Sequence, residues 1–251
     1  MYKVPTIRAE NLLKKHFGVC FPDDYLTFDL ETTGFNKTDD LPIDFGWCLV
    51  RDRLVTSSGG LILNWYARPE YVDPEWLDHK LAKLTEIFAL RDMRWHYSPQ
   101  VLREKGLDPI EVLEYVYDLF GANRSAGASF VGHNAVNYDA PLLKNVLSEY
   151  LHRDWSFDPQ ELFDTGCIEK MLQCSGYLSA SMQLFPTAGE SMACFFKRAS
   201  WARRPGVYWN MQHCLERYRL CEEHGIRVAD LHGAEVDSYG CYLYLEHHRE
   251  R

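Results

Sequence analysis

An alternating run near the amino terminus, "YLTFDLE" at residues 25–31, constrains the fold more than any other stretch of this sequence. Its period of two predicts a β-strand, because alternate side chains of a strand point to opposite faces. Three apolar residues share one face, whereas Asp29 and Glu31 lie next to each other on the other face. Carboxylates are uncommon in strands and costly near a core. Something must therefore compensate this pair, and a metal ion is one candidate.

The segments that follow predict the remaining architecture. Residues 43–50 and 54–63 predict two further strands joined by the polar turn "RDR", and hence an antiparallel meander. Capping residues before proline mark two helix starts, at Ser98 and at Asp108. The other expected elements are helices at 75–90, 98–106, 108–121, 139–151, 210–225 and 231–248, a loop at 121–129, a buried strand at 129–134, and a strand edge followed by a helix at 161–173.

This order of elements predicts an α/β fold. Strands come first and helices are interleaved later, which indicates a single domain over residues 25–251, preceded by an arm at 1–24. Residues 175–206 are rich in Ser, Gly, Phe and Arg and have weak periodicity. We expect them to form an irregular basic and aromatic insertion.

Several features bear on the compartment. No apolar run approaches the roughly 18 residues of a membrane span, and the amino terminus has no apolar segment typical of a signal peptide. The eight cysteines are dispersed and contain no C-x-x-C. In a chain without a secretion signal this favours free thiols in a reducing compartment. We therefore expect a protein that is neither secreted nor membrane-spanning, in the cytoplasm or alternatively in the nucleus.

The formal net charge of −9 argues against an extensive nonspecific grip on nucleic acid, which needs a basic surface. The same charge is compatible with an enzyme of short footprint whose acidic site is neutralised by divalent ions.

Three short segments concentrate residue types that carry chemistry. They are "FDLETTG" with Asp29 and Glu31, "VGHNAVNYDAPLL" with Asp139, and "LHGAEVDSYG" with His232 and Asp237. Taken singly, each has an ordinary explanation. A D-x-E arises by chance among 36 acidic residues, Asp139 suits a helix N-cap, and a lone histidine is usually a surface or core-edge residue.

Together and in this order, the segments resemble the three motifs of the DEDDh (DnaQ-like) 3′→5′ exonucleases. Within that family they are most similar to the three-prime repair exonucleases, whose second motif has the form H-N-x-x-x-Y-D-x-P-L-L; residues 133–143 here are "HNAVNYDAPLL". The third motif, H-x-A-E-x-D, is matched by residues 232–237. Exonuclease I shares the additional residue between Asn and Asp of the second motif. The resemblance spans about residues 24–246.

The resemblance implies a ribonuclease H-like fold with a mixed five-stranded sheet flanked by helices. It also implies a metal-dependent exonuclease that releases 5′-mononucleotides from a nucleic acid with a free 3′ end, with single-stranded or frayed DNA favoured. RNA is the alternative substrate, because the sequence does not identify a residue that would distinguish DNA from RNA at the 2′-hydroxyl. An alternative of a different class is a catalytically silent nucleic-acid-binding module.

By the same resemblance, two divalent ions would be held by four acids. Asp29 would bridge both ions, Glu31 and Asp237 would serve the ion on the nucleophile side, and Asp139 would hold the other. Mg²⁺ or Mn²⁺ suits this set, since hard cations prefer carboxylate and water oxygens. His232 would be the general base, because its ordinary pKa lies near working pH.

Glycine directly after His232 predicts that the histidine sits on a loop before the last helix, with Asp237 one turn into that helix.

Substrate contacts are expected next to the motifs. Thr32, Thr33, Gly34 and Phe35 follow the first motif, where relatives contact the terminal nucleotide, and Phe35 would wedge between the last bases by stacking. A half-buried turn aromatic is the alternative for Phe35. Asn134 would orient the strand or cap its own loop.

A basic and aromatic cluster follows in the insertion, and no role from the family is carried over to it. Its charge and rings suit a single strand, with ordinary loop packing as the alternative. The candidate strand contacts are Lys197, Arg198, Trp201, Arg203 and Arg204.

Two further expectations concern partners. The stretch "HCLERYRLCEEH", with His213, Cys214, Cys221 and His224, has the wrong spacing for common zinc motifs, so we expect no zinc. Residues 59–66, "GGLILNWY", would form an exposed third strand that would allow a homodimer through sheet edges, as in members of the subgroup. Edge strands are also often simply protected.

Overall fold

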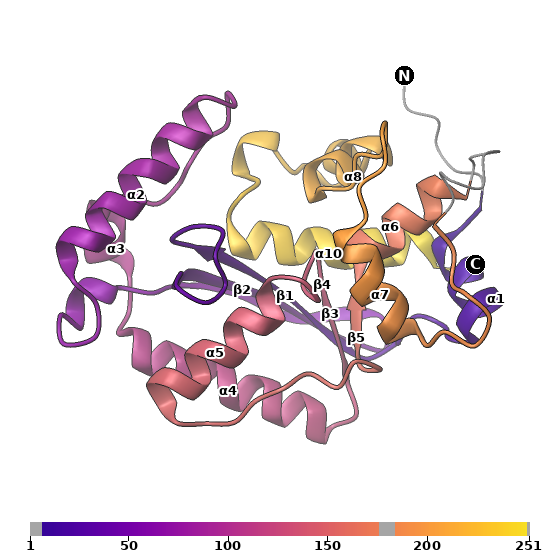
Figure 1. The fold of residues 1–251 in the computed structure, drawn as a ribbon, viewed down its shortest axis with the longest axis horizontal. Coiled ribbons are helices and arrows are strands. Elements are labelled where there is room, and N and C mark those ends of the chain that lie inside the picture. Colours follow the sequence, from indigo (N-terminus) through magenta and orange to yellow (C-terminus); the bar gives the residue numbers. More distant parts are fainter. Residues whose placement is uncertain (1–6, 176–183, 250–251) are drawn as a thin grey trace.

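A computed structural model describes residues 7–175 and 184–249 of the chain (Figure 1). Its centre is a five-stranded sheet in the order β3-β2-β1-β4-β5. The first three strands form an antiparallel meander, while β4 and β5 run parallel to β1, so the predicted mixed five-stranded sheet is confirmed. The strands are β1 (Tyr25–Thr32), β2 (Pro42–Arg51), β3 (Leu54–Ile62), β4 (Ser129–Gly132) and β5 (Leu162–Asp164).

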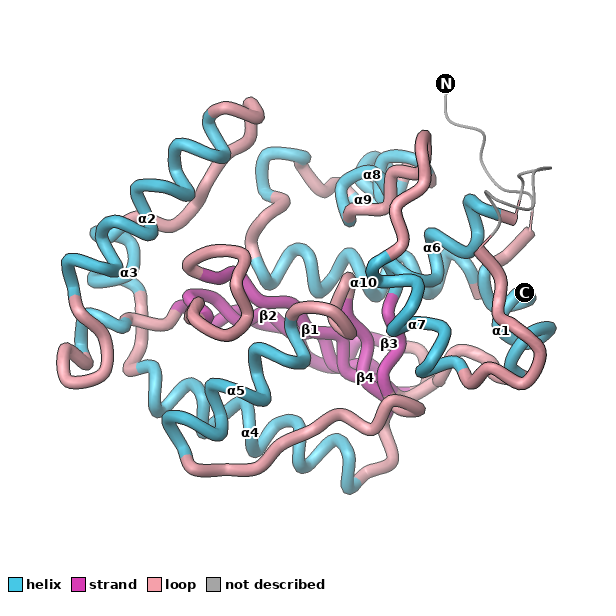
Figure 2. The backbone as a smooth tube through the Cα atoms, viewed as in Figure 1, coloured by secondary structure: helices cyan, strands magenta, loops and turns pink. Residues whose placement is uncertain are grey.

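Helices cover both faces of this sheet (Figure 2). One face carries α2 (Pro74–Ala89), α3 (Pro99–Lys105), α4 (Pro109–Ser125) and α5 (Asp139–Leu151). The other carries α1 (Ala9–Phe17), α6 (Thr165–Cys174), α7 (Met192–Trp201), α8 (Met211–Arg217), α9 (Leu220–His224) and α10 (Ala234–His248). Two short 3₁₀ turns lie at Trp65–Ala67 and Val228–Asp230. Among the described residues, none of these helices is both long enough and apolar enough to cross a membrane.

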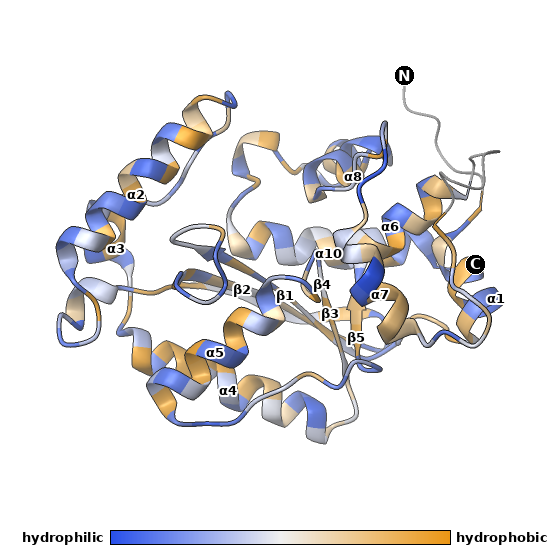
Figure 3. Cartoon of the chain, viewed as in Figure 1, coloured by the Kyte–Doolittle hydropathy of each residue, from blue (hydrophilic) through white to orange (hydrophobic). Residues whose placement is uncertain are grey.

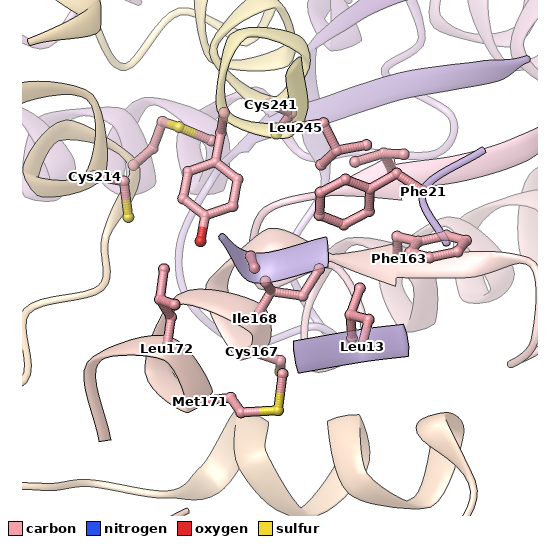
Figure 4. Close-up of a cluster of buried hydrophobic side chains, with 14 of the residues drawn as sticks. Leu13, Phe21, Phe163, Cys167, Ile168, Met171, Leu172, Cys214, Cys241 and Leu245 are labelled. Carbon is pink, nitrogen blue, oxygen red and sulfur yellow. The ribbon is translucent and has the colours of Figure 1, made fainter. Parts of the chain in front are cut away.

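The alternation of β1 separates two hydrophobic cores. Leu26, Phe28 and Leu30 pack with α4 and α5, whereas Tyr25 belongs to the core under α10. Figure 4 shows that second core, where Cys241 and other residues of α10 meet α6 and α1. The helices alternate between hydrophilic and hydrophobic residues (Figure 3), as expected of amphipathic helices packed on a sheet. Asp29 and Glu31 consequently share the face of β1 on which α10 lies.

The predicted helix starts are confirmed by their caps. The Ser98 hydroxyl accepts a hydrogen bond from the Val101 backbone, and the Asp108 carboxylate accepts from Ile110 and Glu111. A proline occupies the first turn of both helices, where its missing N–H costs nothing.

Three segments differ from the sequence-based expectation. The α4 helix continues to Ser125 through the predicted loop. The single helix expected at 210–225 is two helices, because Arg219 between them adopts a φ of 60°. Part of the predicted irregular insertion forms α7, which Ser191 caps and whose Phe195 and Phe196 are fully buried. A ten-residue helix has fewer than three turns, so its apolar period repeats too few times to be recognised in the sequence.

The predicted arm also contains a packed helix. Ala9, Leu12 and Leu13 of α1 are buried in the core next to α6. Residues 1–6 of the arm and 176–183 of the insertion lie outside the described residues. All eight cysteines are free, six of them buried.

The first turn of α10 rests directly on the backbone of β2 at Gly46. A Cβ at this position would lie 2.0 Å from the carbonyl carbon of Ala234 and 2.2 Å from the backbone nitrogen of Glu235. Gly46 pairs with Asp29 across the β1–β2 ladder. The absence of a side chain at Gly46 therefore brings the start of α10 next to the acidic pair.

Gly46→Ala should destabilise the fold by about 3 kcal/mol, because backbone on both sides leaves a Cβ no room. The matched control is Gly121→Ala within α4, where an added Cβ meets nothing within 4 Å. It should stabilise by about 0.5–1 kcal/mol, since alanine favours a helix. Urea denaturation measures both, and equal effects of the two substitutions would contradict the packing of α10 on Gly46.

Candidate active site

The four predicted acids converge on one cavity of about 350 Å³. Asp29 and Glu31 come from β1, Asp139 is the first residue of α5, and Asp237 lies in the first turn of α10. Figure 2 shows the amino ends of α5 and α10 beside the sheet. More than 200 residues of sequence thus separate carboxylates that line the same cavity.

His232 joins this group from the loop before α10, as the sequence predicts. Its backbone has a φ of 66°, and Gly233 forms the N-cap position of the helix. Ligand atoms of Glu31, His232 and Asp237 all lie within 4.8 Å of one another. These three side chains form an arrangement that could hold a metal ion.

Burial raises the pKa values of all four acids, and neighbouring carboxylates raise those of Asp29, Glu31 and Asp139 further. Those of Asp29 and Glu31 lie well above their usual range, first because of burial and then because of neighbouring Asp237. Burial raises the pKa of Asp237 to about 7, against a backbone hydrogen bond from His232. The pKa of Asp139 reaches about 8, through burial and nearby Asp164. Four charged carboxylates therefore require a compensating cation here.

The histidine is shifted toward its neutral form. Burial, followed by the charges of His96 and Arg91, lowers the pKa of His232. The ring of Phe88 meets the imidazole edge-on at 5.3 Å between centroids. A neutral imidazole at working pH has a lone pair with which to accept a proton.

Two buried polar atoms without hydrogen-bond partners show whether a divalent cation fits between these side chains. Asp237 Oδ1 and His232 Nε2 are buried without a hydrogen-bond partner among the described residues. Buried polar atoms in native structures normally have partners, so an orphaned carboxylate oxygen in an acidic cavity indicates a missing ligand. The carboxylate oxygens of this set suit Mg²⁺ or Mn²⁺. The residues present fit such ions.

The loop of the second motif is held by a residue that the sequence analysis did not single out. Asp164, at the end of β5, is fully buried and accepts hydrogen bonds from the backbone of Asn134 at 3.2 Å and Val136 at 3.0 Å. Asn134 has a φ of 63°, a conformation that asparagine tolerates better than most residues. These bonds place Asn134 at the cavity rim, before Asp139.

The predicted substrate residues of the first motif have different surroundings. The Thr32 hydroxyl donates to the Gly34 carbonyl at 2.7 Å and lies 2.9 Å from the Tyr138 hydroxyl, which also donates to Gly34. Thr33 is buried and donates to Asp40, away from the cavity lining. Tyr138 belongs to the second motif, but the sequence analysis did not predict it as a site residue.

Phe35 is the exposed member of this group. Its side chain is 65% exposed while it also lines the cavity, together with Gly34 and Asn134. A phenylalanine at a cavity mouth, without a core to pack into, has its ring face available for stacking.

Apolar side chains form a further part of the cavity lining, which we call the apolar wall. It is formed by Leu84 and Phe88 of α2 and by Trp95 after that helix. The sequence analysis missed this wall, because ordinary helix residues carry no signal of facing a site rather than a core.

Most side chains of the basic cluster interact with other groups of this protein. Arg198 binds Glu190 through two hydrogen bonds, and the Arg203 guanidinium lies over the Trp209 ring at 5.5 Å. Arg204 donates to the carbonyl of Arg203.

Two members of the cluster face outward. Lys197 is exposed, and Trp201 is 64% exposed. The Lys37 ammonium lies 5.6 Å from the Trp201 ring centroid and donates to the Asn137 carbonyl at the cavity rim. The end of α7 therefore lies near the loops of the first and second motifs.

The four residues considered for zinc do not gather. Cys214 and Cys221 are buried, whereas His213 is half-buried and His224 exposed. Among the described residues, none of these four belongs to the metal-holding group found at Glu31.

The fold is shared with solved structures of exonuclease I. The E. coli enzyme in complex with a 5cy-dA13 oligonucleotide superposes with a TM-score of 0.56 and 16% identity, over 91% of this chain and 41% of that one. Its complex with 5cy-dT13 gives 0.55 and 16%, over 89% and 40%. The zinc-bound form of its complex with single-stranded DNA gives 0.53 and 17%, over 88% and 39%.

The chain thus spans about two-fifths of the length of those structures. Neither a protein-family model nor a curated protein sequence matches it. At this level of identity the likeness establishes the fold. The predicted ribonuclease H-like fold is therefore confirmed, while the likeness to the three-prime repair exonucleases stays a prediction.

The raised pKa values predict how stability depends on pH without metal. Asp237 has an ordinary pKa of 3.8 and a folded pKa of about 7. Its contribution to stability is therefore present below about pH 4 and lost as the pH rises through about 7. In a chelator, the Tm of the wild type should fall more steeply between these pH values than that of Asp237→Asn.

Asp118→Asn, at an exposed position of α4, is the control and should leave the wild-type pH dependence unchanged. Saturating Mg²⁺ should raise the wild-type Tm more at high pH than at low pH, because the cation binds the charged carboxylates of the folded chain. Thermal melts across the pH range measure both effects. Identical pH profiles of wild type and Asp237→Asn would contradict this account of the site.

Proposed function

We propose that this chain is a metal-dependent 3′→5′ exonuclease that releases 5′-mononucleotides, with single-stranded DNA favoured. The observation that carries the proposal is the convergence of four acids on one open cavity, with a histidine of lowered pKa within 4.8 Å of two of them. The exonuclease I structures support it, since several hold DNA oligonucleotides or single-stranded DNA.

The acids would hold two divalent ions, Mg²⁺ or Mn²⁺. Asp29 interacts electrostatically with the other three acids, and ligand atoms of Glu31 and Asp237 lie within 4.8 Å of those of His232. Asp139, at the amino end of α5, would hold the second position. When bound, such ions lower the pKa of water and stabilise charge on the reacting phosphate and the departing oxygen.

His232 would act as the general base. Burial and neighbouring cations keep its imidazole neutral, and Nε2 has no hydrogen-bond partner in the part of the chain that the structure describes. Glu31 and Asp237, within 4.8 Å, would stabilise the imidazolium that forms when this ring takes the proton of the attacking water. The wall of Phe88 and Trp95 limits the water around the ring.

Exposed aromatic rings would receive the substrate strand. Phe35 stands at the cavity mouth, and Trp201 lies farther along the surface beyond Lys37. Aromatic rings stack on unpaired bases of any sequence, and a lysine between them would meet the phosphate backbone. This pair of rings favours a single strand with accessible bases over a closed duplex.

A nuclease assay tests the proposal. Single-stranded DNA labelled at its 3′ end should release labelled mononucleotide as the first product, and circular single-stranded DNA should stay intact. Asp29→Asn and His232→Ala should each lower kcat at least about 100-fold, because they remove a metal ligand and the base. Asp118→Asn, at an exposed position of α4, should retain wild-type kcat.

Parallel reactions with duplex DNA and RNA, each with Mg²⁺, Mn²⁺, Zn²⁺ or chelator, define the substrate and the ion. Faster cleavage of RNA than of single-stranded DNA would overturn the preference, and internal cuts in the circle would overturn the exonuclease assignment. Full activity in chelator, or in Asp29→Asn, would overturn the metal-dependent mechanism.

A further inference from the structure

Asp44 of β2 is a buried carboxylate that the proposed chemistry does not use. It pairs with Glu31 across the β1–β2 ladder, yet it lines a neighbouring cavity rather than the one lined by Asp29, Asp139 and Asp237. Its residue is only 6% exposed. A carboxylate at this depth is costly unless donors reach it, so its partners indicate its role.

Two donors converge on one oxygen of Asp44. The Tyr97 hydroxyl and the Ala234 backbone N–H, at 3.2 Å, both donate to Oδ2. Ala234 is the first residue of α10, and Gly233 at the N-cap has no side chain with which to bond the free N–H groups of that helix end. Asp44 therefore supplies from β2 the cap that the local sequence lacks.

This cap acts next to His232. The histidine precedes Ala234 by two residues and holds a backbone conformation, φ 66°, that non-glycine residues seldom adopt. On its other side, His96 Nε2 lies within hydrogen-bond distance, 3.2 Å, of the Leu231 carbonyl oxygen. His96 adjoins Tyr97 in the chain. Asp44 thus holds the segment after His232, and His96 holds the segment before it. Tyr97, next to His96 in the chain, also donates to Asp44.

We infer that Asp44 is a positioning residue, which holds the His232 ring at Glu31 and Asp237 by fixing the Ala234 N–H. This inference rests on the proposed function, in which His232 is the base. Asp44 acts through the backbone of α10 and does not line the acid cavity, although its charge also raises the pKa values of Asp29 and Glu31. A displaced base lowers the rate of the chemical step while leaving substrate binding intact.

Kinetics of three variants test the inference. Asp44→Ala removes the acceptor and should lower kcat about 30-fold, with KM for single-stranded DNA unchanged. Its half-saturating Mg²⁺ concentration should equal that of Asp44→Asn, which loses the same charge beside Glu31. Asp44→Asn keeps an oxygen acceptor for both donors and should retain kcat within about threefold. Asp73→Ala is the matched control, because Asp73 caps α2 in the same way but far from His232. It should lower Tm and leave kcat unchanged.

A double-mutant cycle and a spectroscopic readout separate positioning from general stability. In a His232→Ala background, Asp44→Ala should lower kcat no further, because its effect passes through the histidine. The ¹³C signal of the His232 ring, assigned by its loss in His232→Ala, should shift in Asp44→Ala and stay in place in Asp73→Ala.

Three results would overturn the inference. Equal losses of kcat in Asp44→Asn and Asp44→Ala, with a raised Mg²⁺ requirement, would make Asp44 a metal ligand. An additive double-mutant cycle, or an unchanged His232 signal in Asp44→Ala, would mean that Asp44 does not act through the histidine ring. A wild type that cleaves no nucleic acid would refute the proposed function instead. The His232 signal would then still decide whether Asp44 positions the ring.

Discussion

The contact between the first turn of α10 and the bare backbone of β2 at Gly46 is the constraint on which the site depends. Any side chain at Gly46 would displace Ala234 and with it the two functional residues that flank this turn, His232 and Asp237. Because Gly46 pairs with Asp29, the contact places a helix amino end, which favours negative charge, beside an acidic strand. The sheet then supplies a rigid base, with one core beneath α10 and another beneath α4 and α5.

The electrostatics of the cavity follow from this close packing. The fold holds Asp29, Glu31, Asp139 and Asp237 where burial raises their pKa values, and repulsion adds to the shift at the first three. Without a counter-ion the charged forms therefore oppose folding. The same environment lowers the pKa of His232. An acid cluster that needs cations and a histidine that stays neutral are complementary requirements of metal-assisted hydrolysis. Under the proposed function, the stability lost through these buried charges would be the cost of a site that binds cations.

Sequence patterns predicted the fold well where they are local. Alternation in β1, turn chemistry in the meander and proline-marked caps at Ser98 and Asp108 all have short-range causes. Motif order brought the acids and His232 into one hypothesis, and the structure brings the acids into one cavity with His232 next to Glu31 and Asp237. What escaped prediction has long-range causes: Asp164 under the second-motif loop, the α2 wall, and Asp44, which caps a helix 190 residues away. Only assembled geometry distinguishes such residues from ordinary strand-end acids and helix faces.

The central claim is that distant carboxylates form one site for a pair of divalent cations. Counting bound Mn²⁺ by electron paramagnetic resonance, in the presence of a 5′-mononucleotide product, tests it most directly, because free and bound Mn²⁺ give different signals. The account predicts two Mn²⁺ per wild-type chain and fewer in Asp29→Asn, since Asp29 serves both positions. A wild type that binds no more Mn²⁺ than Asp29→Asn would contradict it.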